Sequence, residues 1–128
     1  MTTVQQLIAE ARPQIEGLDV AAMAAELKRP GVVLVDVREP DERAQHGTIP
    51  GAMAAPRGML EFYADPSTPY HKKELDPKAR ILLFCAAGSR SALAGATLHR
   101  MGFENVAHLE GGFKAWAEAG HEVAPVQR

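Results

Sequence analysis

The chain has 128 residues, enough for one domain with a buried hydrophobic core. Its 14 basic and 16 acidic residues give a net charge of −2 without a block of like charge, which argues against nucleic-acid binding. No apolar run approaches the roughly 20 residues that cross a bilayer, and the first residues lack the layout of a signal peptide. We therefore expect a cytoplasmic protein whose partners include neither nucleic acid nor a membrane.

Two helical patterns come first along the chain. Apolar residues recur at helical spacing over residues 4–11 and again over residues 20–27. Gly17 reads as a break between them. The sequence thus predicts an amino-terminal helical extension over residues 1–17 and a main domain over residues 18–128.

Strand and helix signals then alternate. The run VVLVDV at 32–37 is apolar and β-branched, as in a strand covered on both faces. A helix is predicted from Pro40 to Gly47, a short strand within residues 48–56, and a short helix over residues 57–63. Residues 64–80 contain three prolines and form either a functional loop or a surface segment.

The second half repeats this alternation. ILLF at 81–84 predicts another buried strand, followed by a helix that Gly102 caps. A short strand over Val106 to Leu109 and a last helix over residues 112–119 complete the chain. Such alternation indicates an α/β domain with a mostly parallel sheet.

The string CAAGSRS connects the strand 81–84 to its helix. Ligands of open α/β sheets bind at the carboxyl ends of strands, where a helix amino terminus offers free N–H groups. The backbone is free to curl into an anion cradle because the residues after Cys85 are small, namely Ala86, Ala87 and Gly88. Arg90 adds a positive charge. These features favour a reactive thiolate at Cys85 over a buried structural cysteine.

Three segments together resemble the rhodanese family. VVLVDVREPDE with GTIPGAMAAP is similar to its amino-terminal signature, FCAAGSRSA to its active-site loop, and GGFKAWAEAGHEV to its carboxyl-terminal signature. They occur in the family's order and cover about residues 18–124. The resemblance implies a three-layer domain in which helices flank both faces of a mostly parallel sheet of about five strands.

The resemblance also implies a sulfurtransferase activity without a metal or organic cofactor. Cys85 would take a sulfane sulfur from thiosulfate or a similar anion and hold it as a persulfide. A thiol or cyanide would then accept the sulfur, and a protein persulfide could serve as donor or acceptor. The substrate would lie against the loop, whose residues are Ala86, Ala87, Gly88, Ser89 and Arg90, with Ser91 in support.

Three other charged residues are candidates for the site. Asp36 and Arg38 are candidates for catalytic polar groups, but we interpret them as an ion pair that connects a strand end to its neighbouring loops. Arg57 follows a predicted short strand and is a candidate for a second anion contact. The five histidines show no metal-ligand spacing, so no metal site is predicted.

Alternative functions remain open. Related phosphatases have a loop that is one residue longer, so a phosphatase or arsenate reductase activity is a distant alternative. A non-catalytic binding module is another: some rhodanese domains have lost the cysteine and serve as regulators, but this chain retains Cys85. Thiol redox chemistry would need an outside thiol, because no second cysteine is present.

Overall fold

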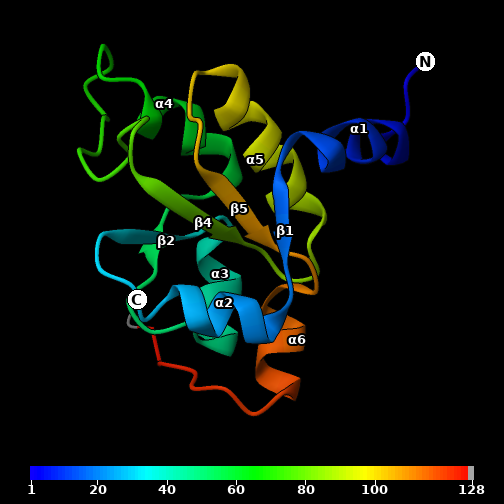
Figure 1. The fold of residues 1–128 in the computed structure, drawn as a ribbon, viewed down its shortest axis with the longest axis vertical. Coiled ribbons are helices and arrows are strands. Elements are labelled where there is room, and N and C mark those ends of the chain that lie inside the picture. The colour runs from blue at the N-terminus through cyan, green and yellow to red at the C-terminus, as the bar shows by residue number, and fades with distance from the viewer. Residues whose placement is uncertain (127–128) are drawn as a thin grey trace.

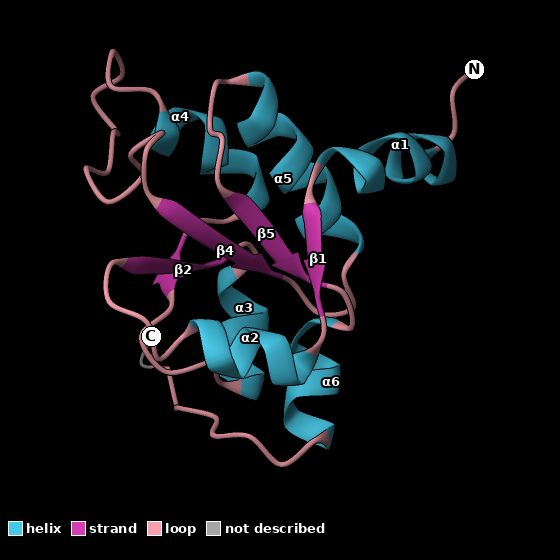
Figure 2. Ribbon diagram, in the orientation of Figure 1, coloured by secondary structure: helices cyan, strands magenta, loops and turns pink. Residues whose placement is uncertain are grey.

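The computed structural model describes residues 1–126 and is built on one parallel sheet. The sheet has five strands in the order β1-β5-β4-β2-β3, which confirms the predicted α/β class (Figure 2). The strands are β1 (Glu16–Leu18), β2 (Val32–Asp36), β3 (Met53–Ala54), β4 (Arg80–Phe84) and β5 (Val106–Leu109). β4 therefore lies at the centre, between β5 and β2.

Helices cover both faces of the sheet. α4 and α5 lie on one side, with α1 next to α5, whereas α2, α3 and α6 lie on the other (Figure 1). The helices are α1 (Val4–Ala11), α2 (Val20–Glu26), α3 (Pro40–His46), α4 (Leu60–Ala64), α5 (Ser89–Arg100) and α6 (Gly112–Glu118). This arrangement is the predicted three-layer domain.

The alternation of side chains along β4 creates two cores. Ile81 and Leu83 pack in the cluster under α4 and α5, which also contains Cys85. Leu82 and Phe84 point the other way and pack with residues of α2 and α6. Because side chains alternate between the two faces along a strand, the side chain of Cys85 lies on the same face as those of Ile81 and Leu83. Its sulfur is directed toward the start of α5.

Helix boundaries follow the predicted signals. Pro40 opens α3 behind a capping box formed by Glu39 and Glu42. Gly102 follows α5 with φ +101°, the left-handed conformation expected of a residue that ends a helix. Local chemistry thus determined where these helices begin and end.

One strand was not predicted. β1 includes Gly17, which the sequence pattern had marked as a break, and it pairs in parallel with β5 at the edge of the sheet. A three-residue strand has no detectable apolar period, so only its pairing with β5 defines it. The strand spans the boundary proposed at residue 17, and that boundary stays a prediction.

The loop before β4 folds back on α4. Lys72 donates its amide to the carbonyl of Tyr63, and the side chain of Leu75, also in the loop, is buried. The loop enters β4 at its amino end, whereas Cys85 follows the carboxyl end. Its hydrogen bonds therefore place it beside α4, at the opposite end of the strands from the cysteine.

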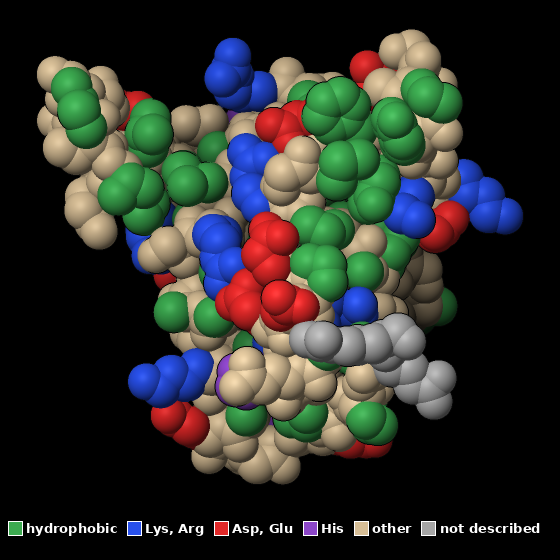
Figure 3. Space-filling view, turned by 180° about the vertical axis from the view of Figure 1, so that it is seen from behind, with side chains coloured by type: hydrophobic (Ala, Val, Ile, Leu, Met, Phe, Trp, Pro, Cys, Tyr) green, Lys and Arg blue, Asp and Glu red, His purple; other side chains and the backbone are tan. Residues whose placement is uncertain are grey.

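The surface carries charges of both signs. On the face seen in Figure 3, acidic and basic side chains lie together across the middle, and hydrophobic side chains gather above them. Within residues 1–126, no helix is long and apolar enough to cross a membrane.

A buried ion network secures the end of β2. Asp36 is fully buried and accepts hydrogen bonds from the guanidinium of Arg38 at 2.8 and 3.0 Å. Arg43 and the hydroxyl of Thr48 donate to the same carboxylate at 3.0 and 2.9 Å. The Arg38 guanidinium also lies 4.3 Å from the ring centroid of Phe113. This geometry agrees with the interpretation of Asp36 and Arg38 as a structural pair.

Removing Asp36 should therefore destabilise the fold. Asp36→Ala would leave Arg38 buried without its counter-ion, and we expect a loss of about 3–5 kcal/mol in the free energy of unfolding. Urea denaturation measures this value. Glu74→Ala, which removes an exposed carboxylate, is the matched control and should leave the midpoint unchanged. Equal midpoints for both variants would contradict the structural role.

Candidate active site

Cys85 occupies the first position after the central strand β4. Its side chain is only 1% exposed, and it lies at the sheet edge where the carboxyl ends of the parallel strands meet. This is the edge at which α/β sheets bind ligands. The sequence placed the cysteine here correctly.

The chain curls around the sulfur after Cys85. The amides of Gly88 and Ser91 donate to Sγ at 3.1 and 3.3 Å. Gly88 makes the curl possible because its φ of +106° is strained for any residue with a Cβ atom. Two amide dipoles directed at one sulfur stabilise negative charge on it.

The loop offers further amide donors. Within residues 1–126, the N–H groups of four loop residues donate to no protein acceptor, namely Ala86, Ala87, Ser89 and Arg90. Ala87 and Ser89 are exposed, so this side of the loop faces solvent. Because α5 starts here, its dipole adds to the positive potential. The loop thus has the donors that an anionic ligand needs.

The start of α6 holds the loop from behind. Phe113 and Lys114 donate their amides to the carbonyls of Cys85 and Ala86 at 2.8 and 3.1 Å. Gly112 has φ +66°, and a Cβ there would collide with the Ala86 carbonyl. The carbonyls of Cys85 and Ala86 are thus paired with α6, and the loop amides remain as donors for a ligand.

Arg90 forms an ion pair that the sequence did not indicate. Its two terminal nitrogens donate to the two carboxylate oxygens of Glu42 in α3, at 2.7 and 2.8 Å. Hydrogen bonding to Glu42 raises the pKa of Arg90, and the same bond lowers the pKa of Glu42 to about 2. The pair connects α3 to α5 and fixes the arginine beside the loop.

Arg57 is not brought to the loop. Its guanidinium donates to Glu61 at 2.7 Å and to the hydroxyl of Thr97 at 3.0 Å, on the third turn of α5. Within the described residues, none of its hydrogen bonds reaches positions 85–90. The geometry gives no support to the predicted anion contact.

Behind the cysteine lies a polar pair that sequence reasoning did not assign to the site as a unit. Ser91 and His108 are both fully buried, and Ser91 Oγ lies 2.7 Å from His108 Nδ1. The sequence predicts no role for His108, one of the five histidines that lack metal-ligand spacing. A histidine in the middle of an otherwise apolar buried strand was the available signal.

A cavity of about 490 Å³ opens beside the loop. Its lining includes the apolar Ala86, Phe113 and Ala117 together with the charged Glu42 and Lys114. The cavity is large enough for a small organic molecule, and it borders the loop at Ala86, the residue after Cys85. Within residues 1–126, no group of three or more potential ligands is placed to hold a metal ion.

Comparison with known proteins assigns the family. The profile described as Rhodanese-like domain matches residues 19–119, which is most of the chain. The chain belongs to the rhodanese-like domain family. Its cysteine loop lies inside the matched residues, as does every strand from β2 to β5.

Relatives of this rhodanese-like domain support the assignment. A sulfurtransferase from Allochromatium vinosum is 36% identical over 89 residues, covering 70% of this chain and 75% of that protein. A protein of unknown function from Rhodopseudomonas palustris, described as a possible tyrosine phosphatase, superposes with a TM-score of 0.91 at 41% identity, covering 96% and 95% of the two chains. The polysulfide-sulfur transferase homodimer of Wolinella succinogenes gives a TM-score of 0.75 at 30% identity, covering 94% and 86%.

Gly88 and Gly102 offer a matched test of how tightly the loop is packed. Both have positive φ, but a Cβ on Gly88 would collide with the carbonyl of Glu110, whereas Gly102 has open space. Gly102→Ala should lose about 1–3 kcal/mol from backbone strain alone. Gly88→Ala should lose more in the same urea titration. Similar losses would mean that the loop can move away from Glu110.

The Arg90–Glu42 pair predicts a pH dependence of stability. Since the pair lowers the pKa of Glu42 from 4.5 to about 2, its contribution is complete above 4.5 and is lost as the pH falls toward 2. Glu42→Gln removes this contribution. Denaturation across this range should show wild type more stable than Glu42→Gln above the upper value, with the difference disappearing at the lower one. A difference independent of pH would refute the assignment.

Proposed function

We propose that this rhodanese-like domain transfers a sulfane sulfur from a small anionic donor to a thiophilic acceptor through a persulfide on Cys85. The observation that carries the proposal is the sulfur itself, held by the amides of Gly88 and Ser91 in a loop whose further N–H groups have no acceptor within residues 1–126. The sulfurtransferase and the polysulfide-sulfur transferase among its relatives support the same class of reaction. The donor we propose is thiosulfate, a small dianion that an anion cradle can hold.

The first half-reaction begins with the Cys85 thiolate. It attacks the outer sulfur of thiosulfate, the S–S bond of the donor breaks, and sulfite leaves with the bonding electron pair. Cys85 then carries a persulfide anion, so the total charge is unchanged. The free amides of the loop would hold the donor oxygens and then the terminal sulfur, with Arg90 held beside them by Glu42.

The second half-reaction restores the thiolate. A nucleophile such as cyanide or a thiolate attacks the terminal sulfur, and the Cys85–sulfur bond breaks with its electrons returning to Cys85. The cavity beside Ala86 and Phe113 would admit an organic thiol or the tip of a protein persulfide. Because donor and acceptor use the same sulfur in turn, the kinetics should be ping-pong.

A phosphatase activity has less support from the geometry. The relative from Rhodopseudomonas palustris is described as a possible tyrosine phosphatase. In such a reaction the loop arginine would have to grip a phosphoryl group with both terminal nitrogens. Here Glu42 engages both nitrogens of Arg90, and the loop has the shorter cysteine-to-arginine spacing.

Intact mass after incubation with thiosulfate tests the proposal. Wild-type protein should gain one sulfur atom, and cyanide should remove it with formation of thiocyanate. Cys85→Ser should gain nothing, because an alkoxide is not available at neutral pH to attack the donor. Both proteins are then assayed with p-nitrophenyl phosphate.

Each result assigns the site differently. Loading of wild type alone supports the persulfide cycle. Phosphate release without sulfur loading would replace the proposal with the phosphatase alternative. Neither activity, with thiosulfate, polysulfide and glutathione persulfide all tried, would indicate a binding module.

A further inference from the structure

His108 stands where the core calls for an apolar side chain. It lies in β5 between two other strands, fully buried, and all four residues of this strand are buried. Burial of an imidazole without hydrogen bonds is unfavourable, so both ring nitrogens need partners. Each nitrogen has one, and the two partners lead in opposite directions.

The outer partner fixes the tautomer of the imidazole. Nε2 of His108 lies 3.3 Å from a carboxylate oxygen of Glu110, whose other oxygen pairs with Arg12 at 2.6 Å. A carboxylate can only accept, so Nε2 carries the proton of the neutral ring. Nδ1 is then left as an acceptor that faces inward.

The inner partner connects the ring to the cysteine. Ser91 Oγ is 2.7 Å from Nδ1, closer than the 3.2 Å to the carbonyl of Gly88, so its hydroxyl proton belongs to His108. The same Oγ lies 3.6 Å from Sγ of Cys85, within the range of an S–H donor. The three side chains therefore form one continuous line of proton donors and acceptors.

From this line we infer that Ser91 and His108 act as a buried proton relay that takes the thiol proton of Cys85 and so prepares the nucleophile. The inference deepens the proposed function, since it concerns how the same sulfur is activated. His108 acts through Ser91 and is a positioning and relay residue that does not touch the substrate.

The proton transfer balances without an external reagent. The Cys85 S–H proton moves to Ser91 Oγ as the Ser91 hydroxyl proton moves to Nδ1 of His108. The products are a thiolate, an unchanged serine and an imidazolium, so the net charge of the site is preserved. The Gly88 and Ser91 amides stabilise the thiolate, and Glu110 stabilises the imidazolium.

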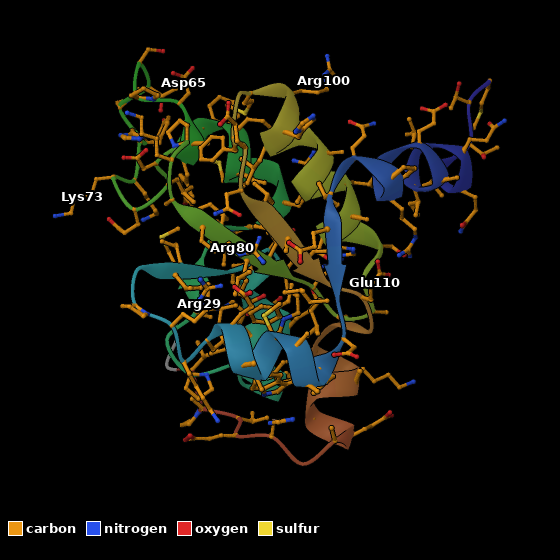
Figure 4. All side chains as sticks on the ribbon, in the orientation of Figure 1. Arg29, Asp65, Lys73, Arg80, Arg100 and Glu110 are labelled. Atoms are coloured by element: carbon orange, nitrogen blue, oxygen red, sulfur yellow. The ribbon has the colours of Figure 1, made fainter. Side chains whose placement is uncertain are left out.

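The outer end of the relay is built into the packing. Glu110 lies beside β1 (Figure 4), and a Cβ on Gly17 would displace its carboxylate. Gly17 in β1 therefore leaves space for the Glu110 side chain at the point where it approaches His108. The charged and titratable groups facing His108 are Glu110, Arg12 behind it, and Cys85 through Ser91.

The burial of His108 keeps its ring neutral before the transfer. Desolvation lowers the pKa of His108, and Glu110 opposes this only in part. The ring is therefore neutral near pH 7, as an acceptor must be, and becomes charged only together with the thiolate that pairs with it.

Alkylation of Cys85 by iodoacetamide measures the relay apart from sulfur transfer. His108→Asn keeps an acceptor near the position of Nδ1 but has no basic nitrogen. We expect its alkylation at about pH 6 to be about 10-fold slower than wild type, less than a direct base contributes because a serine intervenes. At high pH, where hydroxide removes the thiol proton, the two rates should converge. His99→Asn, the same change on an exposed position of α5, should match wild type throughout.

The outcomes separate this inference from the proposed function. A rate lowered equally at every pH, or unchanged, would overturn the relay and leave His108 as a packing residue. Thermal unfolding of His108→Asn identifies any general loss of structure. If thiosulfate fails to load wild type while the His108→Asn profile changes as expected, the relay holds and the sulfur donor is wrong. If thiosulfate loads wild type and the His108→Asn profile is unchanged, the proposed function holds and the relay is wrong.

Discussion

Two hydrogen bonds to one sulfur define the shape of this molecule's active end. For the amides of Gly88 and Ser91 to reach Cys85 Sγ, the chain must leave β4, turn through a left-handed residue and enter α5 with only four residues, 85–88, between the two elements. That turn is tolerated only because Gly88 has no Cβ to strike the carbonyl of Glu110 and because α6 binds the outward carbonyls. Loop, helix start and neighbouring strand end are therefore a single constraint, and a change in any one moves the sulfur.

Much of this arrangement followed from local sequence signals. The buried strands β2 and β4, the start of α3 at Pro40, the glycine after α5 and the cysteine loop were all predicted, because each depends on residues close together in the chain. The family resemblance added the three-layer architecture. Local periodicity and capping chemistry are sufficient for such elements.

What escaped prediction depends on contacts between distant segments. β1 is a strand only because β5 pairs with it, and the Arg90–Glu42 pair joins α5 to α3 across 48 positions of the chain. Arg57 was a reasonable anion contact from its place after a short strand, yet Glu61 and Thr97 engage it elsewhere. His108 could have been suspected from a polar residue inside an apolar strand, but its partner Ser91 is 17 positions away. Tertiary pairing has no signature in a local window.

The brevity of the two outer strands has a consequence for association between molecules. β1 has three residues and β3 has two, so each edge of the sheet offers few unpaired backbone groups to an incoming strand. β1 also carries Glu16, whose carboxylate pairs with Arg80, and a charged edge is a poor template for strand addition. The apolar five-residue strands β2 and β4 lie inside the sheet, where each is paired with a neighbouring strand on both sides. The fold thus limits strand addition to the sheet, while Ala87 and Ser89 of the cysteine loop stay exposed.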